Sequence, residues 1–114
     1  MSYWANLTQN GKNVEVDRHQ ESGTFVAGGT LEATLNVTYN YSRYYATSLG
    51  SEGLLWLDGK RAAETVDKLE SAVETLGTKR AHDYWESTEG NAGYALSILL
   101  SWARQHPEAV WMIR

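Results

Sequence analysis

The sequence contains a ten-residue segment, residues 31–40, in which apolar and polar side chains alternate without a break. Strict alternation over this length is typical of a strand with one buried face and one exposed face. Such a strand needs neighbouring strands and a layer that covers its apolar side, so the chain must build a covered sheet. The side chains expected on the buried side are Leu31, Ala33, Leu35, Val37 and Tyr39.

A second strand signal lies at the N-terminus, around Asn10-Gly11. This dipeptide predicts a two-residue type I′ hairpin turn, because both turn residues need positive φ. The turn fixes a register in which one face is apolar and the other is polar except for Trp4. The predicted pairs are Leu7–Val14, Ala5–Val16 and Tyr3–Arg18 on the first face, and Thr8–Asn13, Asn6–Glu15 and Trp4–Asp17 on the second.

The segment between these strands contains glycines that leave two topologies open. Residues 21–23 predict a looser turn, and residues 24–27 predict a short strand. Gly28-Gly29 then forms either a tight hairpin turn, which places Val26 opposite Leu31, or a bulge in one long bent strand.

The second half of the chain changes to helical periodicity. Residues 62–76 carry apolar side chains at spacings of four and three, and Gly77 follows as a helix-ending residue. The apolar face consists of Ala62, Val66, Leu69, Val73 and Leu76. The preceding apolar residues 54–57 are expected to close one end of the core.

A second helix is predicted from about Glu89 to Gln105, with Thr88 as its N-cap. Apolar residues occupy so much of its circumference that it should be central. Pro107 ends the helix region, and the β-prone residues 109–113 predict a short edge strand.

The expected fold is therefore a single α+β domain over residues 1–114. An antiparallel hairpin or meander sheet of three to five strands packs against two main helices, with a short C-terminal edge strand. The chain has no cysteine, and its first residues have neither a basic region nor an apolar run. We therefore expect a cytoplasmic protein without disulfides or a membrane span.

Several classes of function find no support in the sequence. The net charge is −4, with acidic and basic residues interspersed, which argues against binding to a nucleic-acid backbone. No metal-ligand spacing and no nucleophile elbow occurs, so neither a metal nor a cofactor is expected. The only close pair of a histidine and a carboxylate is His82-Asp83, which with Arg43 would suit a small hydrolase or transferase.

Residues 39–45 contain four tyrosines and Arg43. They predict either an aromatic rim with Tyr39 in the core, or a wall that stacks on a ligand and binds its anionic group through Arg43. Residues 82–91 likewise predict either a conventional capped helix start with Trp85 as a hydrophobic staple, or an anion site with the small residue Gly90.

If these two segments converge, they form one site for a small anionic aromatic ligand, such as a nucleotide derivative. Glu86 and Glu89 oppose this interpretation because they repel anions. The residues predicted to bind the ligand are Tyr41, Arg43, Tyr44, Tyr84, Trp85, Thr88 and Asn91.

Residues 4–7, 36–42, 83–96 and 106–109 resemble a family of small bacteriophage and bacterial proteins that has no assigned biochemical function. The resemblance covers nearly the whole chain and implies an intracellular, phage-type accessory protein. It implies no catalytic residues.

Three functions follow as hypotheses. The first is a non-catalytic phage-type accessory protein that binds or sequesters a nucleotide-like anion or a host factor. The second is a protein-interaction or homo-oligomeric module that uses Trp4 and exposed tyrosines, since interfaces favour Trp and Tyr. The third is the hydrolase or transferase that uses His82 and Asp83.

Overall fold

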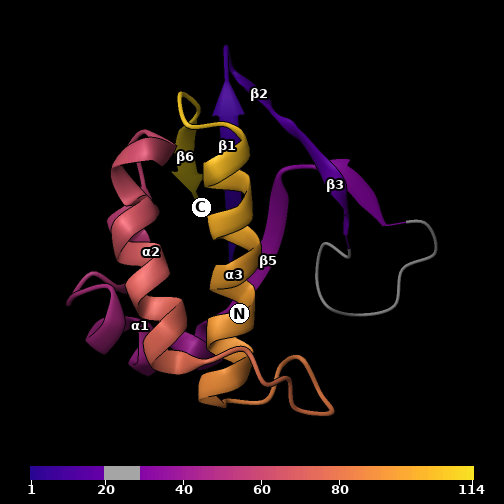
Figure 1. Ribbon diagram of the computed structural model, residues 1–114. Coiled ribbons are helices and arrows are strands. Elements are labelled where there is room, and N and C mark those ends of the chain that lie inside the picture. Colours follow the sequence, from indigo (N-terminus) through magenta and orange to yellow (C-terminus); the bar gives the residue numbers. More distant parts are fainter. Residues whose placement is uncertain (20–28) are drawn as a thin grey trace.

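The strand β1 (Ser2–Gln9) is the centre of the main sheet in the computed structural model, which describes residues 1–19 and 29–114 (Figure 1). The α+β fold is confirmed, with the main helices on one side of this sheet. The other strands are β2 (Lys12–Asn13), β3 (Glu15–His19), β4 (Thr30–Glu32), β5 (Thr34–Thr38) and β6 (Val110–Ile113). The α-helices are α1 (Ser42–Ser48), α2 (Ala62–Leu76) and α3 (Glu89–Gln105), and the short 3-10 helices are η1 (Tyr39–Tyr41) and η2 (Gly53–Leu57).

The predicted hairpin turn is present. Asn10 and Gly11 have φ values of 55° and 79°, and Thr8 pairs with Asn13 as expected. Val14 also hydrogen-bonds to Leu7 as predicted, but for the residues before Leu7 the predicted register is wrong, because β1 there pairs with β5. The observed partners of Tyr3, Trp4 and Ala5 are Val37, Asn36 and Leu35, in place of Arg18, Asp17 and Val16.

The change of partner occurs at Leu7. Its carbonyl accepts a hydrogen bond from the Val14 N–H (2.9 Å), while its own N–H donates to the Ala33 carbonyl (3.0 Å). A longer hairpin would have placed Arg18 on the inner face of the sheet, whereas β5 places the fully buried Val37 there. Burying a charge without a partner is costly, so β5 is the better neighbour.

The alternating segment 31–40 is not one strand. It changes sheets at Ala33, because β4 pairs with β3 in a separate two-stranded sheet, and it ends at Thr38. Leu31 and Tyr39, predicted to be buried, are 42% and 40% exposed. The expectations for residues 20–28, including the turn, the strand and Gly28, lie outside the described residues.

The two predicted helices have the expected bounds. Gly77 has a φ of 76° directly after α2, and the Thr88 side chain caps α3 by accepting the Asn91 N–H. On α2, however, Val66 and Val73 are only half-buried. The helix is rotated so that its buried residues are Ala62, Thr65, Leu69, Ala72 and Leu76.

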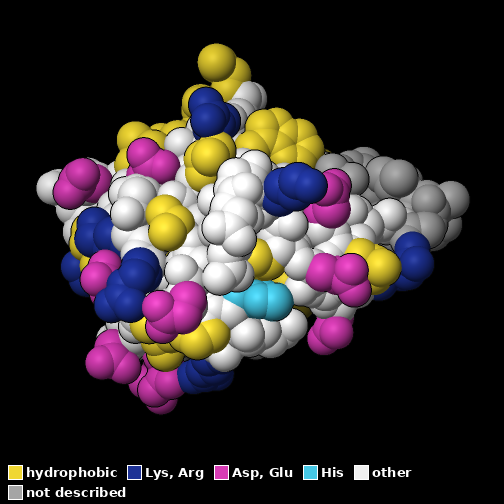
Figure 2. All heavy atoms as spheres, turned by 90° about the horizontal axis from the view of Figure 1, so that it is seen from above, with side chains coloured by type: hydrophobic (Ala, Val, Ile, Leu, Met, Phe, Trp, Pro, Cys, Tyr) yellow, Lys and Arg dark blue, Asp and Glu magenta, His cyan; other side chains and the backbone are white. Residues whose placement is uncertain are grey.

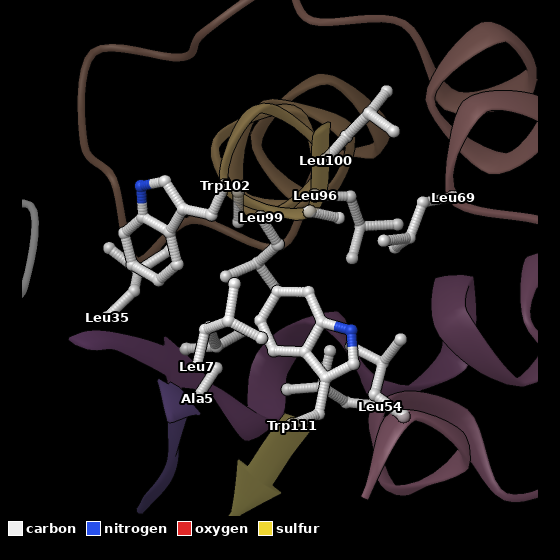
Figure 3. Close-up of a cluster of buried hydrophobic side chains, with 14 of the residues drawn as sticks. Ala5, Leu7, Leu35, Leu54, Leu69, Leu96, Leu99, Leu100, Trp102 and Trp111 are labelled. Atoms are coloured by element: carbon white, nitrogen blue, oxygen red, sulfur yellow. The ribbon is translucent and has the colours of Figure 1, made fainter. Parts of the chain in front are cut away.

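The core lies between the main sheet and the pair α2–α3. Trp111 of β6 projects from the sheet towards α3, where Leu99 and Leu96 surround it (Figure 3). Its ring N–H has a hydrogen-bond partner in this apolar setting, because it donates to the Thr65 hydroxyl of α2 (2.9 Å). Of the apolar residues 54–57, Leu54 and Leu57 are buried, whereas Leu55 is 43% exposed. In the described part of the chain, no helix has the length and apolar content to cross a membrane.

Candidate functional site

The tyrosine-rich residues 39–45 and residues 82–91 lie side by side, so the two segments singled out in the sequence converge. Three hydrogen bonds join them at the surface. They run from the Tyr44 hydroxyl to the Ser87 carbonyl (3.1 Å), from the Ser87 hydroxyl to the Asn40 carbonyl (2.9 Å), and from the Asn40 amide to the Trp85 carbonyl (2.9 Å).

The tyrosines lie on helical turns, which the alternation did not predict. The Thr38 hydroxyl accepts the Asn40 N–H and starts η1, which leads directly into α1. A helical spacing of four brings Tyr41 and Tyr45 to the same face, where both are buried. The predicted rim with Tyr39 in the core is therefore wrong, since Tyr39 lies at the surface and Tyr41 is 0% exposed.

Three buried hydroxyl groups connect this aromatic cluster to its surroundings. Tyr41 donates to the Tyr84 carbonyl, and Tyr84 donates to the Asn36 carbonyl of β5 (2.9 Å). Tyr45 donates to the Ala92 carbonyl of α3 (2.9 Å). The hydroxyls of Tyr41 and Tyr84 are thus used inside the protein and do not face a ligand.

Asn91 of α3 fixes residues 81–86 through hydrogen bonds to their backbone. Its side chain, in a residue only 2% exposed, accepts the Ala81 N–H (2.9 Å). Its amide donates to the carbonyls of Asp83 (2.8 Å) and Glu86 (3.0 Å), with the Tyr84 carbonyl at 3.3 Å. One buried amide therefore fixes the backbone on both sides of the turn, as a satisfied polar group must.

The other predicted site residues are at least partly accessible. The Arg43 guanidinium lies 4.8 Å from the centre of the Tyr44 ring and donates to its hydroxyl (2.7 Å). Trp85 is half-buried with its ring edge-on to Tyr84 (5.1 Å between centroids). Of the seven predicted residues, Tyr41, Tyr84 and Asn91 are internal, Arg43 is exposed, and Tyr44, Trp85 and Thr88 are half-buried.

The buried tyrosines predict instability in alkali. Loss of hydration raises the pKa of Tyr41, Tyr45 and Tyr84 above the ordinary value near 10. The unfolded chain therefore loses these protons first, so the free energy of unfolding should fall as the pH rises above about 10. The slope should approach roughly 4 kcal/mol per pH unit, at about 1.4 kcal/mol for each tyrosine.

Guanidinium unfolding at stepped pH values measures this slope, with tyrosinate absorbance as the second readout. The Tyr45→Phe variant should lose about a third of it, since one of three groups no longer titrates. An equally steep fall in that variant would show that Tyr45 does not contribute.

The side chains of His82 and Asp83 have different surroundings. His82 is exposed, and an Asp83 carboxylate oxygen accepts the Trp85 N–H (3.0 Å), which stabilises the turn. Within residues 1–19 and 29–114, no hydrogen bond joins the two side chains, and no group of three or more acidic or histidine residues is placed to hold a metal.

A solvent-open hollow of about 370 Å³ lies beside the first turn of α3. Two cations line it, although the sequence analysis had not selected them. They reach this position because Gly90 lets the backbone of Lys79 pass directly over the helix, where a Cβ would come within 1.9 Å of the Lys79 carbonyl. The lining residues are Leu76, Lys79, Arg80, Ala81, Thr88, Glu89 and Gly90.

Arg80 is held at the hollow by an aromatic contact. Its guanidinium lies 4.5 Å from the centre of the Tyr94 ring, one turn further along α3. Elsewhere, basic and acidic side chains are interspersed on the face shown in Figure 2, without a basic stripe. The charged side chains that line the hollow are thus two basic residues, Lys79 and Arg80, and one acidic residue, Glu89.

No known protein family, curated protein or solved structure matches this chain. The resemblance to small phage and bacterial proteins stays a prediction.

Proposed function

We propose that this protein is a non-catalytic binding protein that holds a small anionic ligand in the hollow beside the start of α3. The observation that carries the proposal is the position of Lys79 and Arg80 over the first turn of that helix. The first N–H groups of a helix have no partners within it and carry partial positive charge. Thr88 takes one of these N–H groups, that of Asn91, and the ligand would accept from those before it.

The chemistry of the hollow favours a phosphate or carboxylate group. Lys79 supplies a point charge, and Arg80 supplies a planar fork that matches two oxygen atoms. A volume of about 370 Å³ falls within the roughly 300–1,000 Å³ of small-molecule sites. Glu89 lines the same hollow and should weaken the binding of anions. Its negative charge offsets part of the attraction that Lys79 and Arg80 exert on an anionic ligand.

The buried residues predicted as ligand contacts have a supporting role in this proposal. Asn91, Tyr41 and Tyr84 hold residues 81–88 in place, and so fix the position of the hollow's rim. Arg43, Tyr44 and Trp85 form the outer surface of the same junction and can contact a larger ligand or a host protein. This arrangement suits the accessory role that the phage resemblance implies.

The test is a thermal-shift and calorimetric titration with inorganic phosphate, ATP and a cyclic dinucleotide. At least one should raise the melting temperature, because a ligand that binds only the folded state stabilises it. The Lys79→Gln/Arg80→Gln double variant should bind at least about tenfold more weakly, since hydrogen bonds to charged groups contribute roughly 1.5–3 kcal/mol each.

Two matched variants separate this site from general electrostatics. Lys12→Gln, at the far hairpin, removes a positive charge elsewhere and should bind like the natural chain. Glu89→Gln should bind anions more tightly, because it removes the opposing carboxylate. If Lys12→Gln weakens binding as much as the double variant, or if no anion binds at millimolar concentration, the proposal is wrong.

Self-association is a second candidate function, favoured by Trp4. Its neighbours Ala5 and Leu7 are buried, so the even-numbered residues of β1 point away from the core, and Trp4 is 41% exposed. Val110 and Met112 of the adjacent β6 point the same way by the pairing register.

If this face joins two copies of the chain, light scattering should show a concentration-dependent dimer. Trp4→Ser should weaken that dimer by at least about tenfold, since truncation of an interface hot spot costs about 2 kcal/mol or more. A monomer at all concentrations would exclude the self-association.

A further inference from the structure

Asn10 is the only asparagine in the chain that is followed by glycine. Both residues are exposed at the tip of the β1–β2 hairpin, which extends beyond the rest of the main sheet (Figure 1). Nothing lies within 4 Å of a Cβ built on Gly11, so no other part of the described chain crowds this glycine. Among the described residues, the Asn10 carboxamide has no hydrogen-bond partner that would hold it away.

We propose that Asn10 is a site of spontaneous deamidation and isomerisation. The backbone nitrogen of Gly11, after losing its proton to water or hydroxide, attacks the side-chain carbonyl carbon of Asn10. The new C–N bond closes a five-membered succinimide, and the side-chain nitrogen leaves as ammonia. One water molecule then opens the ring at either carbonyl, which yields aspartate or its β-linked isomer.

The short pairing of this hairpin makes the reaction accessible in the folded chain. The attack requires the backbone to leave the turn conformation, in which Asn10 has a φ of 55°. Only two residue pairs, Thr8–Asn13 and Gln9–Lys12, join β2 to β1 before the chain changes partners. Such terminal pairs open locally without global unfolding.

The other asparagines lack this combination of features. Asn36 and Asn91 are buried, and their amides donate hydrogen bonds to Ser2 and to Asp83. Asn6 and Asn40 also donate to backbone carbonyls, and each precedes a residue with a large side chain. Asn13 lies in β2 and precedes the β-branched Val14. A side chain next to the attacking nitrogen hinders ring closure, so the reaction should be confined to Asn10.

The product would change the hairpin as well as its charge. The β-linked isomer adds one methylene to the main chain within a two-residue turn, so Gln9 and Lys12 can no longer pair in the observed register. Either product adds one negative charge next to Lys12. The main sheet should survive, because β5 and β6 supply the other partners of β1.

The experiment incubates the whole chain at neutral and mildly alkaline pH and follows it by intact mass, ammonia release and peptide mapping. We expect a gain of one mass unit confined to residue 10, with both isomers present and a faster rate at the higher pH. The rate should be within about tenfold of that in guanidinium-denatured chain, which corresponds to an opening cost of up to roughly 1.4 kcal/mol.

Asn10→Gly is the matched variant, because glycine suits the positive φ of the turn and has no carboxamide. It should fold normally and gain no mass at the hairpin. The proposal is overturned if Asn10 stays intact in the folded chain while the denatured chain reacts, or if the modification maps to another asparagine.

Discussion

Replacement of Asn91 by alanine should destabilise the protein by roughly 3–5 kcal/mol, because it leaves the Ala81 N–H without its partner and removes two further hydrogen bonds. The two further bonds run to the carbonyls of Asp83 and Glu86, which keep the backbone N–H groups of Glu86 and Thr88 as partners. An unsatisfied buried group costs about 1–3 kcal/mol, and each lost hydrogen bond about 0.5–1.5 kcal/mol. A loss of this size is a large part of the stability of an ordinary domain, which is about 5–15 kcal/mol.

Urea unfolding measures the effect, and two variants show its cause. Asn40→Ala removes one exposed amide, which donates to the Trp85 carbonyl, and should cost less than about 1.5 kcal/mol. Asn91→Asp keeps the size and the acceptor for the Ala81 N–H, but directs a negative charge towards carbonyl oxygens. It should be at least as destabilised at neutral pH, and should recover partly in acid as the new carboxyl is protonated.

If Asn91→Ala proves as stable as Asn40→Ala, the buried amide does not hold the loop. The anion-binding test would then separate two possibilities. Loss of binding with little loss of stability would place Asn91 at the ligand itself, as the sequence analysis predicted. Retention of both binding and stability would show that the Asn91 side chain does not support the hollow.

The elements that could be predicted from sequence are those whose signals are local. The bounds of α3 follow from a capping side chain at Thr88 and from Pro107, and the end of α2 follows from Gly77. The Asn10-Gly11 turn is equally local, since two residues with positive φ determine it. Each of these signals depends on residues within about one turn of the chain and not on distant contacts.

Strand partners could not be predicted in the same way. The alternation in residues 31–40 indicates which side chains face a core, but it does not say which strand lies beside them. The choice at Leu7 between Val14 and Ala33 depends on the burial of Arg18 or Val37, far apart in sequence. Such a choice is made by the assembled core and not by the segment.

The candidate site shows the same division. The two segments selected for their composition do meet, but no helix was predicted for residues 39–45, so the shared helical face of Tyr41 and Tyr45 was missed. Lys79 and Arg80 were missed because an unremarkable loop carries them to the start of α3. A usable signal was present in Gly90 and Gly93, three residues apart on one helix face, which allows a chain to cross closely.

Gly93→Ala should therefore disrupt both the fold and the site. A Cβ at this buried position would lie 1.8 Å from the Gly77 carbonyl oxygen and 3.0 Å from the Leu76 Cβ. Because the first contact is with backbone, no side-chain rotation relieves it, and α2 must move away from α3. We expect a net loss of at least about 2 kcal/mol, since a clash with backbone places the overpacking cost at about 3 kcal/mol or more and the gain in helix propensity of about 1 kcal/mol offsets only part of it.

Gly59→Ala is the control for this prediction. Gly59 lies just after η2 and has a φ of 82°, and nothing lies within 4 Å of its Cβ position. Its cost should be only that of the left-handed backbone, about 1–2 kcal/mol, with anion binding unchanged. In Gly93→Ala, by contrast, the displaced residues 77–80 should carry Lys79 away from the hollow, so binding should weaken even at temperatures where the chain remains folded. Equal stability and equal binding in the two variants would mean that the close crossing over α3 does not position the two cations.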